Sequence, residues 1–221
     1  MEKPKDAFRK GRLRQAAKAL ENNNFEVYIA ADADAARELV VDGLVAGLME
    51  DANRTSASFG GSMTLVDSGI YDAIKAVPGL SVIDTYDKSV PRYEALEMRR
   101  QALLTDIFLT STNALTMDGK LVNLDGTGNR VAALTFGPKD VIVVAGANKL
   151  CRDTHDAMRR IKDYAAPVNS IRLNRKTPCT KTLKCEDCTS PDRICNSWVI
   201  TEKSLPKGRI KVVLVEQDMG F

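Results

Sequence analysis

The chain has 221 residues, of which 44% are hydrophobic and 28% charged, a balance typical of a soluble globular protein with one substantial α/β domain. Its 32 basic and 29 acidic side chains are well mixed, and the net charge of +3 provides no broad basic surface for nucleic acid. No apolar run approaches the length needed to cross a bilayer, and the charged N-terminus lacks a secretory signal. We therefore expect a cytoplasmic protein with no membrane span and no nucleic-acid partner.

The N-terminal part of the chain predicts helices that alternate with strands. Apolar residues recur at a helical period across 5–22 and stop at three consecutive asparagines, so we expect a helix there. A strand follows at 25–30. Asp32 is suited to cap a second helix through 36–51, although two internal glycines weaken that helix.

The segment 56–77 predicts a short strand, a glycine turn and a helix. Gly60 and Gly61 would let a ligand approach the backbone closely, and Ser62 and Thr64 could add hydroxyl donors where free N–H groups attract phosphate or carboxylate. The alternative is that Ser62 only caps the helix. The segment matches neither a Walker motif nor a dinucleotide fingerprint, so nucleotide binding is not indicated.

A strand at 80–85 is followed by a helix that Pro91 can begin. Three arginines of this helix, Arg92, Arg99 and Arg100, could reach an anionic ligand. We favour the alternative that they form its solvated face, because that is the usual position of charged helix residues.

The stretch 105–146 alternates apolar, strand-like runs with turns; the runs are IFLTSTNAL, KLVNL, RVAAL and VIVVAG. Between the first two runs, Asp118 and Gly119 form a pair that tolerates positive φ, and this pair predicts a β-hairpin. Strands that alternate with helices predict a largely parallel central sheet, to which the hairpin would be an antiparallel addition.

A second glycine turn follows the hairpin, and its residues could bind an anion: Asp125, Gly126, Gly128, Asn129 and Arg130. Backbone N–H groups would surround the anion while the guanidinium supplied charge. The alternative is a tight connection whose glycines only permit positive φ. Because ligands lie beyond the carboxyl ends of parallel strands, both glycine turns and the loop 146–149 could converge.

The next element is a helix that Asp153 or Thr154 can cap and that Pro167 is expected to end. His155, the only histidine, lies in its first turn. We interpret it as a surface or capping residue, because a catalytic histidine would need an orienting partner.

A polar segment at 177–197 carries four cysteines in a C-x5-C-x2-C-x6-C pattern: Cys179, Cys185, Cys188 and Cys195. In a reducing compartment such a cluster favours metal over disulfides, and ligation would order a segment that has little to bury. Four thiolates suit tetrahedral zinc or an iron–sulfur cluster, and the irregular spacing favours [4Fe–4S], with zinc or unligated thiols as alternatives. Strands predicted at 197–203 and 209–218 make the segment an insertion that returns to the sheet.

The chain resembles the lactate-utilisation (LUD) domain family, the group that contains the LutC/YkgG proteins, over residues 5–221 as a single domain. The segments that carry the resemblance are FGGSMTL (59–65), 92–134, VAGANK (144–149), YAAPVNSIRL (164–173) and 185–203. The resemblance implies a Rossmann-like α/β fold of the NagB/RpiA/CoA-transferase type, with helices on both faces of the sheet. It also implies a part in oxidising L-lactate to pyruvate with iron–sulfur partner subunits, but no catalytic set.

These observations support two main hypotheses. The first is an accessory redox subunit that moves electrons through a cysteine-bound cluster while the glycine turns hold an anionic substrate. The second is an enzyme or binding module for a phosphorylated or CoA-linked small molecule, with structural zinc, Arg130 as the anion clamp and Asp118 or Asp125 as acid/base. The sequence leaves open whether the chain is an enzyme by itself, a non-catalytic regulatory module or a homo-oligomer.

Overall fold

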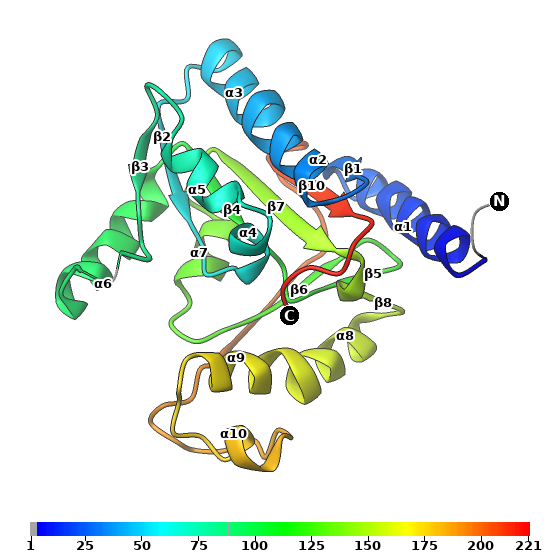
Figure 1. Ribbon diagram of the computed structural model, residues 1–221, viewed down its shortest axis with the longest axis vertical. Helices are drawn as coiled ribbons and strands as arrows, with labels where there is room; N and C mark the ends of the chain where they lie inside the picture. The colour runs from blue at the N-terminus through cyan, green and yellow to red at the C-terminus, as the bar shows by residue number, and fades with distance from the viewer. Residues whose placement is uncertain (1–3, 88) are drawn as a thin grey trace.

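The computed structural model describes residues 4–87 and 89–221, and within these residues the strands form two sheets (Figure 1). The larger sheet is parallel, in the order β1, β10, β7, β4, β2, β3, as the sequence predicts. The bounds are Glu26–Ala30 (β1), Ile210–Val215 (β10), Asp140–Gly146 (β7), Ile107–Thr110 (β4), Ser56–Phe59 (β2) and Ser81–Ile83 (β3). Strands β7 and β10 are buried throughout, which is typical of parallel strands covered on both faces.

The smaller sheet is built around the predicted hairpin. Its order is β8, β5, β6, β9, with bounds Leu150–Cys151, Ala114–Thr116, Leu121–Asp125 and Ser197–Thr201. Strands β5 and β6 are antiparallel, and Gly119 in the turn between them has a φ of 81°. The Asp-Gly pair therefore forms the predicted turn. The predicted run 107–115 is divided between the two sheets, because the chain leaves the larger sheet after Thr110.

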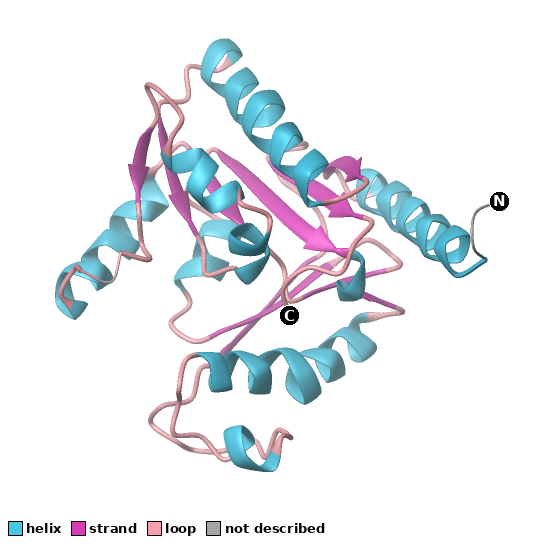
Figure 2. Ribbon diagram, viewed as in Figure 1, coloured by secondary structure: helices cyan, strands magenta, loops and turns pink. Residues whose placement is uncertain are grey.

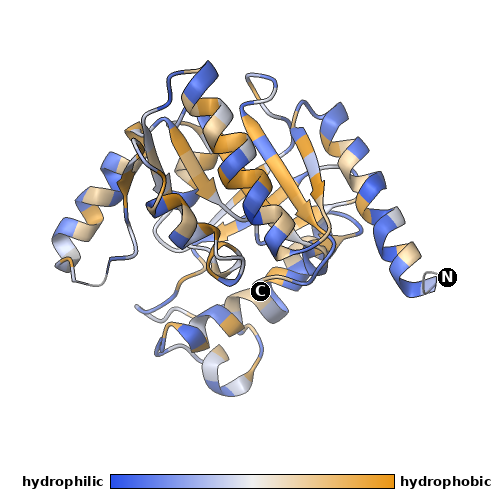
Figure 3. Cartoon of the chain, turned by 45° about the horizontal axis from the view of Figure 1, so that its top comes forward, coloured by the Kyte–Doolittle hydropathy of each residue, from blue (hydrophilic) through white to orange (hydrophobic). Residues whose placement is uncertain are grey.

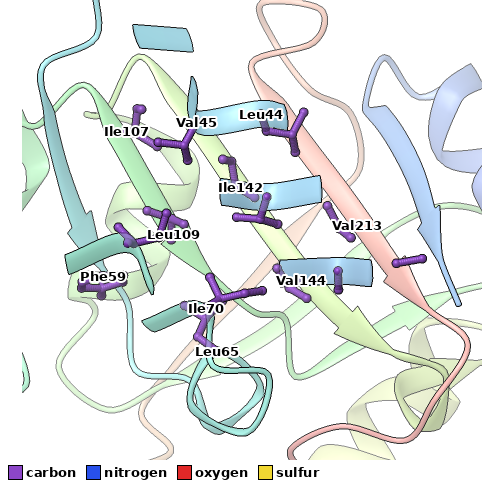
Figure 4. Close-up of a cluster of buried hydrophobic side chains, with 14 of the residues drawn as sticks. Leu44, Val45, Phe59, Leu65, Ile70, Ile107, Leu109, Ile142, Val144 and Val213 are labelled. Carbon is purple, nitrogen blue, oxygen red and sulfur yellow. The ribbon is translucent and has the colours of Figure 1, made fainter. Parts of the chain in front are cut away.

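One face of the larger sheet is covered by a continuous helical stretch and two short helices (Figure 2). These are α2 (Ala33–Glu38), the π-helical turn η1 (Leu39–Val45), α3 (Ala46–Asp51), α4 (Met63–Asp67) and α5 (Ile70–Lys75). Figure 4 shows Leu44, Leu65 and Ile70 of these helices against Leu109 and Ile142 of the strands. Each fully buried side chain of this kind contributes about 1.5–3 kcal/mol relative to exposure.

The opposite face is covered by α1 (Pro4–Asn22) and α7 (Asn129–Thr135). Helix α1 buries Leu13, Ala16, Ala17 and Leu20, which recur at a helical spacing. Figure 3 shows hydrophobic strands between helices that carry many hydrophilic residues, so the main core lies between the helical layers.

The apolar run 130–134 belongs to helix α7, which corrects the expectation of a strand. Gly128 has a φ of 90° and precedes the helix. The buried residues Arg130, Val131, Ala133 and Leu134 are spaced as on one side of a helix and do not alternate as in a strand. An apolar run this short does not distinguish the two by itself.

A second continuous helical stretch packs on the smaller sheet: α8 (Thr154–Arg160), the π-helical turn η4 (Ile161–Ala165) and α9 (Ala166–Arg172). Asp153 caps it, as predicted, by accepting a hydrogen bond from Asp156 N at 2.8 Å. The prediction that Pro167 ends this helix is wrong. The carbonyl that the proline ring would strike, at Asp163, lies in the wider π-helical turn, which accommodates the ring.

The remaining helices are α6 (Arg92–Gln101), the 3-10 turns η2 (Ala102–Leu104) and η3 (Ala147–Lys149), and α10 (Cys179–Thr182). The cysteine segment contains α10, lies beyond α9 from the larger sheet in Figure 1, and leads into β9 and then β10. It is therefore an insertion between a helix and strands of both sheets, as predicted. In the part of the chain that the structure describes, no helix has the length and apolar character to span a membrane.

Candidate anion-binding cleft and cysteine cavity

A cleft of about 470 Å³ opens at the carboxyl ends of the parallel strands. The residues that follow β2, β3, β4 and β7 line it, and the smaller sheet adds the turn after β6. Open parallel sheets place their ligands at this edge, and the volume lies within the range of small-molecule sites.

Both predicted glycine turns and the loop 146–149 reach this cleft. Of the nine predicted ligand-binding residues, those that line it are Gly61, Ser62, Asp125, Gly126, Asn129 and Arg130. The lining residues do not include Gly60, Thr64 or Gly128. The sequence therefore predicts the convergence of the turns. Several of these residues, however, pack against or hydrogen-bond to other parts of the protein.

Gly60 is required by close packing. Its N–H donates to Leu109 O at 2.9 Å, and a Cβ at this position would lie 2.7 Å from side-chain atoms of Phe108 and Thr110. The missing side chain therefore makes room for strand β4, and not for a ligand.

Ser62 caps helix α4, which is the alternative that the sequence left open. Its Oγ accepts a hydrogen bond from Leu65 N at 3.2 Å, and its N–H donates to the Tyr86 hydroxyl. Burial raises the pKa of Tyr86 to about 12, so the phenol stays protonated and donates to Gly60 O at 2.6 Å. Both polar groups of Ser62 would have to exchange an internal partner to bind an anion.

The second glycine turn is closed around Asp125. Its Oδ1 accepts hydrogen bonds from Thr127 N at 3.1 Å and Gly128 N at 2.8 Å. Gly126 allows the cysteine segment to approach, because a Cβ there would lie 3.2 Å from Ile194 O. The turn therefore supports the neighbouring segment as well as the cleft.

Arg130 is buried and has no N–H left for a ligand. Its five N–H groups donate to five protein oxygens: Asp125 Oδ2 at 3.2 Å, Ser111 O at 3.2 Å, Asn123 Oδ1 at 2.6 Å, Asn113 Oδ1 at 2.8 Å and Leu124 O at 3.2 Å. The contacts therefore do not support the prediction of a direct anion clamp. Asp125 in turn is committed to Arg130 and to its own turn, which makes it a poor acid/base candidate.

Asp118 lies at the hairpin and does not line the cleft, so its proposed acid/base role is not supported. A hydrogen bond from Thr116 and an ion pair with Lys120 hold its pKa below the ordinary value. His155 is exposed on α8, as the surface interpretation predicts.

Lys149 is a basic group of the cleft that is not among the nine predicted ligand-binding residues. Its side chain follows β7 and the residue is only 4% exposed, with Nζ 2.8 Å from Thr64 Oγ1 and 2.9 Å from Ser111 Oγ. Burial, followed by the charges of Arg160 and Arg130, lowers its pKa to about 7.

The cleft has an excess of basic side chains. Arg99 of α6 is half-buried in the cleft lining and has no hydrogen bond or ion pair to any described residue. Arg172 of α9 also lines the cleft and donates one hydrogen bond, to Asn169 Oδ1 at 2.9 Å. Arg100 points elsewhere and pairs with Glu97 at 3.1 Å; the side chain of Arg92 lies outside the described part. The solvated-face interpretation therefore suits Arg100, whereas Arg99 is placed to meet a ligand.

The four cysteines of the segment line a single small cavity, and all of them carry free thiols. Asp187 N donates to Cys185 Sγ at 3.4 Å, and the Thr177 hydroxyl lies 3.2 Å from Cys179 Sγ. Among the residues described, no group of three or more histidine, cysteine or acidic side chains is arranged to hold a metal ion. The predicted metal site is thus a shared cavity of thiols and not a closed coordination sphere.

Arg193 organises the loop around this cavity. It donates to Cys188 O at 2.6 Å, to Cys195 O at 3.0 Å and to Asp187 Oδ1 at 2.8 Å. Burial raises the pKa of the Cys195 thiol, so this side chain stays protonated unless a metal binds it.

The cysteine cavity and the cleft are neighbours. Ile194 lines both of them. Helix α9 also contributes to both, with Asn169 and Arg172 on the cleft and Pro167 and Ser170 on the cysteine cavity. A group bound by the thiols would therefore lie one layer of residues from a ligand in the cleft.

The model of the LUD domain family matches residues 13–215. The chain belongs to the LUD domain family. The resemblance found in the motifs is thereby confirmed at the level of the family. No curated protein matches this LUD protein. A crystal structure of a DUF162 family protein from Deinococcus radiodurans is similar to it with a TM-score of 0.49 and 13% sequence identity, over 94% of this chain and 97% of that chain.

Three basic residues of this LUD protein line the cleft but are not among the predicted ligand-binding residues: Lys149, Arg99 and Arg172. The position of Lys149 just after a buried strand is a usable signal, because the carboxyl ends of parallel strands meet at one edge. Arg99 and Arg172 lie on helices far apart in the chain, and nothing local distinguishes them from solvated arginines.

Proposed function

We propose that this LUD protein is an accessory redox subunit in the oxidation of L-lactate, or a related organic acid, to pyruvate. In this proposal the cleft binds the small carboxylate, and Cys179, Cys185, Cys188 and Cys195 bind a [4Fe–4S] cluster. The observation that carries the proposal is the shared wall of the two cavities, formed by Ile194 and helix α9.

The irregular C-x5-C-x2-C-x6-C spacing of the cysteines is the reason for proposing a cluster and not a single zinc ion. Zinc draws four sulfurs to about 2.3 Å from one point, whereas in a cubane each thiolate binds a different iron and the sulfurs stay further apart. The four cysteines line one small cavity, which brings them together as possible ligands of one centre. The N–H···S bond at Cys185 is also of the kind that tunes cluster potentials.

The surrounding residues suit a negatively charged centre. Arg193 lines the cysteine cavity, and Lys162 lies near by through its ion pair with Asp187 at 3.2 Å. When bound, a [4Fe–4S] cluster supplies one-electron transfer. The chain would hold that cluster, orient the carboxylate beside it and pass electrons to or from partner subunits.

The alternative, a module for a phosphorylated or CoA-linked molecule with structural zinc, is less well supported. Its anion clamp, Arg130, has no donor to spare. Of its two acid/base candidates, Asp118 lies outside the cleft, and Asp125 lines the cleft but is bound to Arg130 and to its own turn. The relation of the fold to the NagB/RpiA/CoA-transferase superfamily stays a prediction.

Metal and sulfide analysis of anaerobically purified protein tests the proposal. We expect iron and acid-labile sulfide in the ratio of a [4Fe–4S] cluster, and loss of both in Cys185→Ser. Cys151→Ser is the matched control, because Cys151 is buried in β8 outside the cysteine cavity and its replacement should leave iron unchanged. Colourless protein with one zinc per chain would refute the cluster.

A further inference from the structure

The amine of Lys149 has two hydrogen-bond partners among the described residues, and the residue lines the cleft. Thr64 and Ser111 accept its hydrogen bonds, and each hydroxyl passes its own proton on, to Met219 O at 3.4 Å and to Thr112 O at 3.3 Å. Within residues 4–87 and 89–221, no carboxylate forms an ion pair with Lys149. The third bonding direction of Nζ therefore has no partner among the described residues.

The surroundings of Lys149 favour the uncharged amine. Arg160 of α8 is fixed next to it by Asn148 O at 3.0 Å and Asn113 O at 2.9 Å, and Arg130 of α7 adds a second positive charge. Asp67 of α4 is the acidic group that opposes them. A neutral amine would use its two hydrogens on Thr64 and Ser111 and keep its lone pair for the third direction. Burial and neighbouring cations activate lysine nucleophiles in this way.

We propose that Lys149 is a nucleophilic catalytic residue that forms an imine with a small 2-oxo acid bound in the cleft. The carbonyl supplies the electrophilic carbon. Arg99 lines the same cleft and has no hydrogen bond or ion pair to a described residue, so it is the proposed partner for the carboxylate. The inference rests on the proposed binding of a carboxylate in the cleft, but it does not depend on the cluster.

The step is balanced without any oxidant or reductant. The lone pair of Nζ forms the C–N bond while the carbonyl π electrons move to oxygen, and the first proton that the nitrogen releases is transferred to that oxygen. The hydroxyl of the resulting carbinolamine then leaves as water, as the nitrogen loses its second hydrogen. The hydroxyls of Thr64 and Ser111 lie within hydrogen-bond distance of Nζ and can relay these protons.

Reductive trapping tests the inference. Wild-type protein is incubated with pyruvate and sodium cyanoborohydride, and the conjugate is located by mass spectrometry of the intact chain and its peptides. We expect one reduced pyruvate conjugate per chain, on Lys149, at a rate that rises as the pH passes through about 7. Lys149→Arg keeps the charge but removes the nucleophile, and should lose the conjugate.

Peptide mapping of wild type stays decisive even if Lys149→Arg does not fold. Conjugates spread over surface lysines, or protein that binds pyruvate calorimetrically without being trapped, would overturn the inference. Arg100→Ala is the matched control, because its side chain pairs with Glu97 and does not line the cleft: trapping should persist there at the wild-type rate. If wild-type protein forms the pyruvate conjugate on Lys149 but contains no iron, the cluster is refuted and the imine inference is still supported.

Discussion

Arg130 holds the second glycine turn in place by hydrogen bonds to buried oxygens, so its removal should lower the stability of the fold. Arg130→Ala leaves Asp125 and two asparagine oxygens buried without their donor. Breaking one side of a buried ion pair costs about 3–5 kcal/mol, so we expect a loss of this size in urea unfolding. An unchanged unfolding free energy together with lost carboxylate binding would instead identify Arg130 as a ligand clamp.

Arg99 and Arg100 are adjacent but face different surroundings, which provides a matched pair. Arg99→Ala should weaken binding of L-lactate or pyruvate about tenfold or more, because a charge-assisted hydrogen bond is worth about 1.5–3 kcal/mol. Arg100→Ala removes the same charge from a side chain that pairs with Glu97, and should leave binding within twofold. Isothermal titration calorimetry measures both, and equal effects would mean that only the net charge matters.

Lys149 should make stability depend on pH. Its folded pKa of about 7 lies below its ordinary value of 10.5, so between these values the unfolded chain binds more protons and wild-type stability rises with pH. Below about 7 the buried charge carries its full cost. Lys149→Met removes that cost, so its stability relative to wild type should be highest near pH 7 and should decline towards pH 10. Urea unfolding across this window gives the difference, and a constant difference would contradict the buried, neutral amine.

At the scale of elements, the hairpin is locked to helix α1. Gly119 has positive φ, and a Cβ there would lie 2.5 Å from the backbone of Ala19; Asn23 also donates to Gly119 O at 2.9 Å. Gly119→Ala should cost about 2–4 kcal/mol from backbone strain and overpacking. Gly11→Ala in α1 meets nothing within 4 Å and should stabilise by about 0.5–1 kcal/mol. Thermal or urea unfolding compares them; equal stability would show that the hairpin can shift away from α1.

Local patterns predict the turns and helix caps of this chain more reliably than they predict where a helix continues or begins. The Asp118-Gly119 turn and the Asp153 cap depend on residues next to one another, and both are present. The continuation of a helix through Pro167 depends on a π-helical turn, and the helix at 130–134 depends on a turn at Gly128; neither has a local signature strong enough to read.

At the scale of the whole molecule, the convergence of loops at one sheet edge follows from parallel topology, and the sequence predicts it. The adjacency of the cysteine segment and the cleft does not follow from sequence. It depends on contacts between distant residues, such as Asn196 Nδ2 donating to Gly126 O at 3.0 Å across 70 positions. The structural role of Arg130 does not follow from sequence either, because its hydrogen-bond partners can be identified only in the folded structure.

The redox proposal requires a cluster whose electronic properties change when a carboxylate binds in the cleft on the other side of Ile194. The most direct measurement is the electron paramagnetic resonance spectrum of anaerobically purified, dithionite-reduced protein, recorded with and without saturating L-lactate or pyruvate. We expect the signal of a reduced [4Fe–4S] cluster, and we expect it to change when the carboxylate binds. The absence of any cluster signal, or a signal that saturating carboxylate leaves unaltered, would contradict it.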